Sequence, residues 1–250
     1  MQPHPDIWQE AITISSFDVG ASGHLEAAAL MRHFQETAAR HASNLKVGFV
    51  DLRHDNIFWA LTQIQIEISR WPNMHETVWF ETWPRGIEKL YTTRDYRVKD
   101  QSGHTIINAT SAWIMVDIVK KRPVRPSARL SNIPFVPEEK ALGDFPETIQ
   151  EWNEGTNTRI KERKVAYSDL DINRHVNNTR YVEWIMDATP PSKDEQLKSL
   201  HLQFLHEFLA DETALLQINT IPQTRSFQIS IKHRDNKKTG CLAFFAFVRT

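Results

Sequence analysis

Alternation of apolar and polar residues dominates the chain and predicts antiparallel strands with one buried face. In the clearest case, Ile64, Ile66 and Ile68 alternate with polar residues without interruption. Turn-forming residues at 100–103 and 234–240 separate neighbouring segments of this kind. The other predicted strands span residues 12–17, 77–83, 92–99 and 104–119 in the first half, and 159–167, 200–208, 213–220, 226–233 and 241–249 in the second. We therefore expect a protein built mainly from antiparallel sheet.

Two segments instead carry apolar residues at the spacing of a buried helix face. The face of the first helix comprises Leu30, Phe34, Ala38, His41 and Leu45. Gly48 follows it and predicts the end of the helix. The second helix is expected over Asn178–Ala188, with Tyr181, Val182, Ile185 and Met186 on its buried face. Each half of the chain thus contains one long buried helix.

The order of a strand, a buried helix and further antiparallel strands occurs twice, which predicts an internal duplication. A shift of 150 residues superimposes the two helices and places Phe34 under Trp184. It also places Ala21, Gly23 and Leu25 under Asp171, Asn173 and His175, so the first copy is expected to lack acid–base groups. A helix wrapped by a curved antiparallel sheet is the hotdog fold, so the predicted class is α+β, a tandem or double hotdog. The predicted domains are an N-terminal hotdog at 1–126 that shapes the substrate site, a Pro-containing connector at 127–157 with a short helix or none, and a catalytic C-terminal hotdog at 158–250.

Composition narrows the classes of function. The formal net charge of −1 argues against a nucleic-acid-binding protein, which would carry a basic excess. Cys241 is the single cysteine, so the chain forms no internal disulfide and fits a reducing compartment. No apolar run is long enough to span a membrane, and residues 1–8 lack the features of a signal peptide. We expect a cytoplasmic protein.

The candidate chemistry lies at 167–181, directly before the second helix. In extended geometry the side chains of Asp171, Asn173 and His175 point to one side and converge on a substrate. The imidazole of His175 is the group in this stretch that titrates near neutral pH. The same residue types also serve as ordinary turn and helix caps. The backbone N–H groups of Val176, Asn177 and Asn178, at the start of the helix, are candidates for binding an oxyanion.

The string Asp-x-Asn-x-His-x-Asn-Asn-x-x-Tyr at 171–181 resembles the active-site signature of acyl-acyl carrier protein (acyl-ACP) thioesterases. The resemblance extends to 16–20 and 30–42 and covers nearly the whole chain. It implies a double hotdog that hydrolyses fatty acyl-ACP, releases a free fatty acid and so terminates fatty-acid synthesis, with no metal or organic cofactor. The transit peptide of the plastid members is missing, which indicates a bacterial type.

The resemblance also implies a second carboxylate, because the family carries a Glu, usually followed by Cys, on the strand after the second helix. The matching residues here are Glu207 and Phe208. With Cys241 in an apolar strand, where a buried thiol is inert, we expect attack by water or by the carboxylate of Asp171, with Glu207 positioning water. Strict alternation over 200–208 turns Glu207 away from the face of Leu200 unless a bulge intervenes.

A basic run at 120–129 is a candidate docking site for an acidic carrier protein. Its cations are Lys120, Lys121, Arg122, Arg125 and Arg129, and the cluster of Lys161, Arg163 and Lys164 competes with it for this role. Two other functions use the same fold: an acyl-CoA thioesterase and a non-catalytic acyl-carrier binding protein. The sequence leaves open the length of the acyl chain, its saturation, and assembly into a homo-oligomer.

Overall fold

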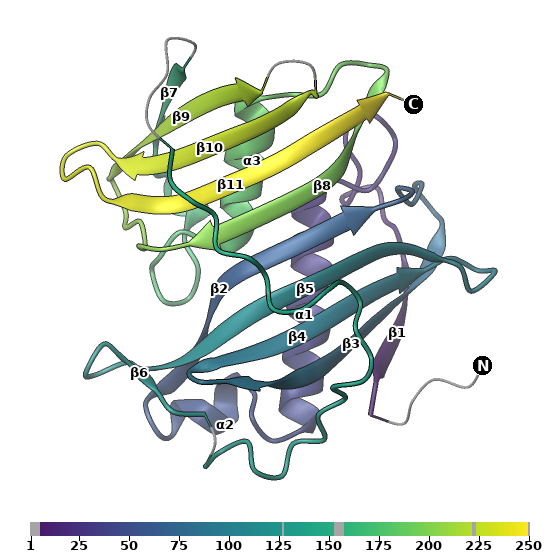
Figure 1. Ribbon diagram of the computed structural model, residues 1–250, viewed down its shortest axis with the longest axis vertical. Helices are drawn as coiled ribbons and strands as arrows, with labels where there is room; N and C mark the ends of the chain where they lie inside the picture. The colour runs from purple at the N-terminus through teal and green to yellow at the C-terminus, as the bar shows by residue number, and fades with distance from the viewer. Residues whose placement is uncertain (1–5, 127, 153–157, 222–223, 250) are drawn as a thin grey trace. The chain divides into compact units, whose positions relative to one another are not determined.

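The computed structural model describes residues 6–126, 128–152, 158–221 and 224–249. These form two compact units, Met1–Pro146 and Glu147–Thr250 (Figure 1). The boundary between the units lies inside the predicted connector at 127–157. Ser127 and residues 153–157 of that connector, and residues 1–5 of the segment used to judge a signal peptide, lie outside the described residues.

In the first unit, an antiparallel sheet packs against one long helix. The elements are β1 (Trp8–Thr13), α1 (Ala27–Asn44), α2 (Phe49–Arg53), β2 (Ile57–Ile68), β3 (Thr77–Glu88), β4 (Tyr91–Lys99), β5 (Thr105–Asp117) and β6 (Arg122–Val124). The strand order is β1-β3-β4-β5-β2, with β6 paired to β5. The helix α1 lies behind the sheet in Figure 1, and its Phe34 packs against Phe80 and Tyr96 of the strands.

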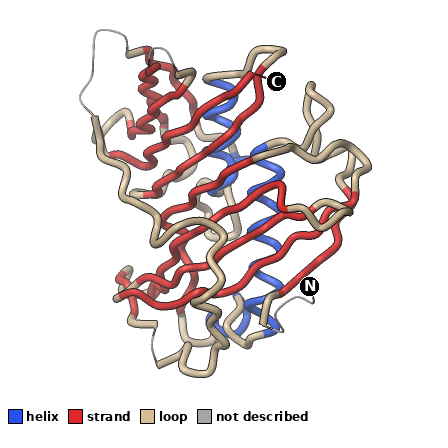
Figure 2. Tube along the Cα trace, turned by 45° about the vertical axis from the view of Figure 1, so that its right-hand side comes forward, coloured by secondary structure: helices blue, strands red, loops and turns tan. Residues whose placement is uncertain are grey.

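The second unit repeats this arrangement. Its elements are β7 (Arg159–Lys164), the 3₁₀ turn η1 (Tyr167–Asp169), α3 (Asn178–Ala188), β8 (Glu195–Phe204), β9 (Thr213–Ile221), β10 (Ser226–His233) and β11 (Thr239–Arg249). The antiparallel order is β7-β9-β10-β11-β8, which matches that of the first unit strand for strand. Figure 2 distinguishes the strands (red) from the helices (blue). The predicted α+β double hotdog is confirmed.

The duplication is visible in individual hydrogen bonds of the loop before each buried helix. The carboxylate of Asp18 accepts the Ser15 N–H, and that of Asp169 accepts the Ala166 N–H. The carbonyl groups of the same two aspartates accept the N–H of Glu26 and Asn177, the residues that cap α1 and α3. Each loop also closes with an isolated bridge, Val19 to Leu25 in one and Leu170 to Val176 in the other.

These bonds fix the offset between the copies at 151 residues, since 169 − 18 = 151, so the predicted shift of 150 is wrong by one. His175 therefore corresponds to His24 rather than to Leu25, and Asp171 corresponds to Gly20. The left-handed backbone at Arg174 (φ 63°) likewise matches Gly23 (φ 75°). The first copy keeps an imidazole and the backbone frame, and lacks the carboxylate of Asp171.

The part of the segment after β6 that extends to Pro146 belongs to the first unit and is bound to β3 and β4. The buried guanidinium of Arg85 donates to Asp95 at 3.1 Å and to the carbonyl of Gly143 at 2.9 Å. The Asp95 carboxylate also accepts the Ala141 N–H at 3.1 Å. Trp83 donates its indole N–H to the carbonyl of Glu139. This stretch has no helix among its described residues and is held by partly buried hydrogen bonds to the buried pair of Arg85 and Asp95 and to Trp83.

Most predicted elements agree with the structure, and their ends account for most of the differences. The second helix and the strand at 226–233 have the predicted bounds. The first strand runs over Trp8–Thr13 rather than 12–17, and the strand expected at 200–208 runs over Glu195–Phe204. The short elements α2 and β6 were not predicted. No helix in the described ranges has the length and apolar character needed to cross a membrane.

Candidate active site

The loop between η1 and α3 is a tight turn organised by Asp171. Its Oδ1 accepts the N–H groups of Asn173 at 2.8 Å and His175 at 3.2 Å. The N–H of Asp171 donates to the carbonyl of His175, and Arg174 occupies the left-handed region. The helix then begins at Asn178, after Asn177 accepts the Thr179 N–H with its side chain. The backbone of His175 is therefore fixed on both sides.

This geometry corrects two predictions from the sequence. Residues 171, 173 and 175 do not alternate along an extended segment, because the Asp171 carboxylate folds the backbone around itself. In addition, the N–H groups of Val176 and Asn177 already donate to the carbonyls of Phe208 and Asp169, so neither is free to bind an oxyanion. The Asn178 N–H, at the first position of α3, has no acceptor among the described residues.

Glu207 comes to His175 because β8 ends at Phe204. Beyond that point the alternation over 200–208 no longer applies, since the N–H groups of Leu205 and His206 both turn to the carbonyl of Gly240. The Oε2 of Glu207 then lies 3.2 Å from the Nδ1 of His175. The side chains are 29% and 55% exposed, so water and a substrate can reach both. The structure thus brings together two of the predicted site residues, and ties Asp171 to the backbone of one of them.

An imidazole held by a carboxylate through one nitrogen can act as a base through the other. If the Nδ1–H of His175 donates to Glu207, its Nε2 carries the lone pair that accepts a proton. Glu207 then fixes the tautomer and stabilises the imidazolium that forms, while Asp171 orients the residue through its backbone. Asn173, half-buried in the same turn, offers a side-chain amide that can donate to a carbonyl oxygen or hold water.

Asp169, a residue that the sequence did not single out, holds this loop. It is 2% exposed and caps the turn at Ala166 while accepting the Asn177 N–H. A signal for it was available, because an Asp followed by an aliphatic residue recurs at Asp18 and Asp169, 151 positions apart. That repeat would also have given the correct offset.

Cys241 is fully buried in β11, as predicted, and burial raises the pKa of its thiol far above the usual range. If the chain hydrolyses thioesters, as the resemblance implies, Cys241→Ala should retain most of that activity, because a buried neutral thiol is a poor nucleophile. Steady-state assays before and after treatment with a thiol reagent check this. Loss of activity in Cys241→Ala, with inactivation of the parent by the reagent, would restore the thiol as nucleophile.

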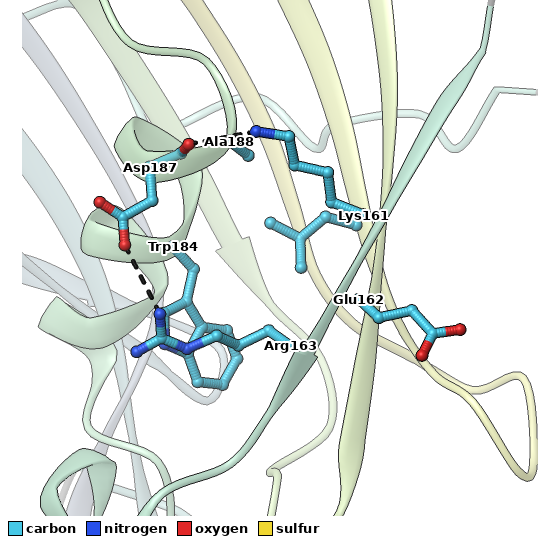
Figure 3. Close-up of a pocket in the computed structure, with 7 residues that line it drawn as sticks. Lys161, Glu162, Arg163, Trp184, Asp187 and Ala188 are labelled. Carbon is cyan, nitrogen blue, oxygen red and sulfur yellow. Dashed lines mark hydrogen bonds and ion pairs between the residues drawn. The ribbon is translucent and has the colours of Figure 1, made fainter.

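A pocket of about 110 Å³ lies elsewhere in the second unit, between β7 and α3 (Figure 3). It is lined by Lys161, Glu162, Arg163, Trp184, Asp187, Ala188 and Leu216. Arg163 pairs with Asp187 at 3.5 Å, Lys161 donates to the carbonyl of Asp187, and Glu162 points away. None of the predicted acid–base residues lines it. Since ligand pockets usually measure about 300–1,000 Å³, this one is too small for an acyl chain.

The two basic clusters differ in how far their charges are neutralised. Arg163 and Lys164 pair with the carboxylates of Asp187 and Asp211, at 3.5 and 3.1 Å, whereas Lys161 donates to the backbone carbonyl of Asp187. In the run at 120–129, Lys120 pairs with Asp117 and Arg129 with Asp55. The exposed cations of that run without an ion pair among the described residues are Lys121, Arg122 and Arg125. The run at 120–129 therefore presents more free positive charge.

Comparison with known proteins gives the family. The model of the acyl-ACP thioesterase N-terminal domain matches residues 5–129, and that of the C-terminal domain matches residues 153–244. The chain belongs to the acyl-ACP thioesterase family. Each matched thioesterase domain falls within one of the two compact units.

Plant thioesterases are among its relatives. The chain is 28% identical over 221 residues to the chloroplastic palmitoyl-acyl carrier protein thioesterase of Arabidopsis thaliana, covering 80% of this chain and 52% of that protein. It is also 28% identical over 225 residues to the oleoyl-acyl carrier protein thioesterase 2 of the same plant, covering 82% and 60%. The chain thus spans about half the length of these curated thioesterases.

Solved thioesterase structures establish the fold. An acyl-ACP thioesterase from Bacteroides thetaiotaomicron superimposes with a TM-score of 0.86 at 24% identity, covering 97% of this chain and 98% of that one. The 12:0-ACP thioesterase from Umbellularia californica gives a TM-score of 0.88 at 20% identity over the full length of both chains. The chain therefore shares the fold of these two structures along nearly its whole length.

Proposed function

We propose that this protein hydrolyses the thioester of fatty acyl-ACP and releases a free fatty acid, the reaction that terminates fatty-acid synthesis. The observation that carries the proposal is the contact of 3.2 Å between His175 and Glu207 beside a loop organised by Asp171. Membership of the acyl-ACP thioesterase family supports the substrate class. The chemistry is assigned to the second unit, because the first lacks both carboxylates. Gly20 stands where the second unit has Asp171. Trp71 stands where it has Glu207, since the Leu25 N–H donates to the carbonyl after Trp71 just as the Val176 N–H donates to the carbonyl after Glu207.

Attack by water fits the site better than attack by Asp171. One carboxylate oxygen of Asp171 already accepts two backbone N–H groups, so an acyl–enzyme ester there would strain the turn that orients His175. In the proposed reaction, the Nε2 of His175 takes a proton from water as its oxygen adds to the thioester carbonyl. The C–S bond then breaks, and the imidazolium returns the proton to the carrier thiolate. Asn173 and the Asn178 N–H are the proposed donors to the oxyanion.

A panel of thioesters tests this function. We expect purified protein to hydrolyse long-chain acyl-ACP with a higher kcat/KM than the matching acyl-CoA, across chains that differ in length and saturation. Preference for acyl-CoA would indicate the alternative carrier on the same fold. Tight binding of acyl-ACP without turnover would indicate a carrier-binding protein instead of an enzyme.

We further propose that the run at 120–129 guides the acidic carrier to the enzyme. Reversing two free cations, Lys121→Glu with Arg122→Glu, is expected to lower kcat/KM for acyl-ACP several-fold at low salt. The loss should shrink as salt rises, because surface charges are screened beyond about 8 Å at physiological ionic strength. Stopped assays over a series of NaCl concentrations measure it.

Two controls separate docking from damage. A short, carrier-free thioester should be hydrolysed at the parental rate, because its chemistry does not use this surface. Charge reversal at Lys164, whose amino group pairs with the carboxylate of Asp211, should have the smaller effect on acyl-ACP. An equal loss on both substrates, or a larger loss from the second cluster, would argue against docking at 120–129.

A further inference from the structure

Glu207 is carried by a short loop whose two ends are fastened to different elements. On one side, the N–H groups of Leu205 and His206 donate to the carbonyl of Gly240, at 2.8 and 3.3 Å. On the other side, the carbonyl of Phe208 accepts the N–H of Val176, the residue after His175. The loop that presents the carboxylate is thus linked directly to the loop that presents the imidazole.

Phe208 anchors this loop in the core. Its side chain is fully buried, and its ring stacks on the ring of His233 with centroids 3.8 Å apart and planes within 6°. The rings of Trp184 and Tyr181 lie 6.1 and 6.2 Å away, so aromatic groups surround the ring on several sides. A buried ring held in this way has little room to shift, because close-packed cores resist changes in volume.

Gly240 packs directly against the Phe208 ring. A Cβ added there would lie 2.3 Å from the Cε2 of Phe208 and 3.0 Å from the carbonyl oxygen of His206. The backbone of Gly240 is not left-handed, so glycine is required here by space rather than by conformation. A side chain at 240 must displace either the Phe208 ring or the backbone that leads to Glu207.

We infer that Phe208, seated against Gly240 and His233, is a positioning residue that sets the distance between Glu207 and His175. The inference rests on the proposed hydrolase function and assigns a role within the same site. The ring holds the peptide that follows Glu207, and the neighbouring carbonyl holds the peptide that follows His175. A displacement of about 1 Å in such a pair is enough to lower turnover roughly a hundredfold.

The test uses Gly240→Ala. We expect kcat on acyl-ACP to fall roughly ten- to hundredfold while KM stays within about twofold, because substrate binding does not depend on this contact. A crystal structure of the variant should show a longer distance between the Nδ1 of His175 and the Oε2 of Glu207. The matched control is Gly86→Ala, since a Cβ at that β3 glycine meets nothing within 4 Å, and its kcat should match the parent.

Rescue distinguishes positioning from general damage. Adding Phe208→Leu to Gly240→Ala removes the clash but keeps an apolar anchor, and should recover most of the lost kcat. Phe208→Leu alone should lower kcat with KM little changed, which keeps the inference testable if Gly240→Ala does not fold. An unchanged kcat in Gly240→Ala overturns the inference. If only Phe208→Leu folds, an unchanged kcat in that variant overturns it. A double variant that folds but does not recover kcat also overturns it.

Failure of the proposed hydrolase function can be distinguished from failure of the positioning role of Phe208. If the parent protein hydrolyses neither acyl-ACP nor acyl-CoA, the function is wrong whatever the variants do. The crystal structure of Gly240→Ala then decides the positioning role alone. An unaltered distance between His175 and Glu207 would refute that role, and an increased one would support it without any assay.

Discussion

Alanine at position 175 is expected to lower the turnover of acyl-ACP by about two to four powers of ten, the range for loss of a general acid–base group. His175 is the proposed acceptor of the proton from water and its donor to the carrier thiol. Since Asp171 holds the backbone of residue 175 rather than its ring, the loop should keep its shape in the variant. Single-turnover assays with saturating enzyme measure the loss in the chemical step directly.

His104→Ala is the matched control, because that imidazole is 81% exposed on a turn of the first unit. Its turnover should equal that of the parent. Circular dichroism and thermal melting of both variants would show that the folds are intact. Near-normal hydrolysis by folded His175→Ala would remove the residue from the mechanism and, with it, the role given to Glu207.

Arg85→Ala should destabilise the first unit by about 3–5 kcal/mol, the usual cost of leaving a buried charge without its partner. Arg85 and Asp95 are 9% and 0% exposed, and the substitution also removes the bond from Arg85 to the carbonyl of Gly143. The segment around Ala141 and Gly143 should loosen with it. Urea unfolding, followed together with hydrogen exchange in that segment, measures both effects.

The loss of stability in Arg85→Ala should also depend on pH. Burial raises the pKa of Asp95 above its ordinary value even with Arg85 beside it, and loss of the cation should raise it further. The folded state then favours the protonated acid, so the loss of stability should grow as the pH rises above the ordinary range of an aspartic acid. Lys140→Ala, which breaks an exposed pair with Asp144 in the same segment, should leave stability close to the parent value. An equal effect of both variants would contradict a buried, coupled pair.

The sequence predicts the fold well because its strongest signals are local. The alternation of Ile64, Ile66 and Ile68, and the apolar face of 178–188, each follow from one buried surface. The first strand is displaced because Trp8–Thr13 pairs with β3 along its whole length, which the pattern of the segment itself does not reveal. The short elements α2 and β6 carry too few residues for any periodicity.

The site is predicted less completely, because its geometry depends on bonds between segments distant in the chain. The alternation of apolar and polar residues predicts that Glu207 points away from the core. In the structure the strand ends earlier, at Phe204, because the N–H groups of Leu205 and His206 turn toward the carbonyl of Gly240. The role of Asp171 also changes, from a side chain in an extended row to the acceptor at the centre of a turn. Asp, Asn and His are compatible with both an extended segment and a tight turn, so the residue types alone do not distinguish the two conformations.

Because two copies of one backbone frame stand in a single chain, natural selection can act on each copy separately. A protein assembled from identical subunits must carry every substitution twice, whereas this chain changes one loop and leaves the other alone. Gly20, in the loop before α1, and Trp71, after β2, show how far the first copy has diverged, while Asp18 still holds the backbone of the loop before α1. The loop before α1 can therefore change in sequence while the loop that carries His175 stays the same.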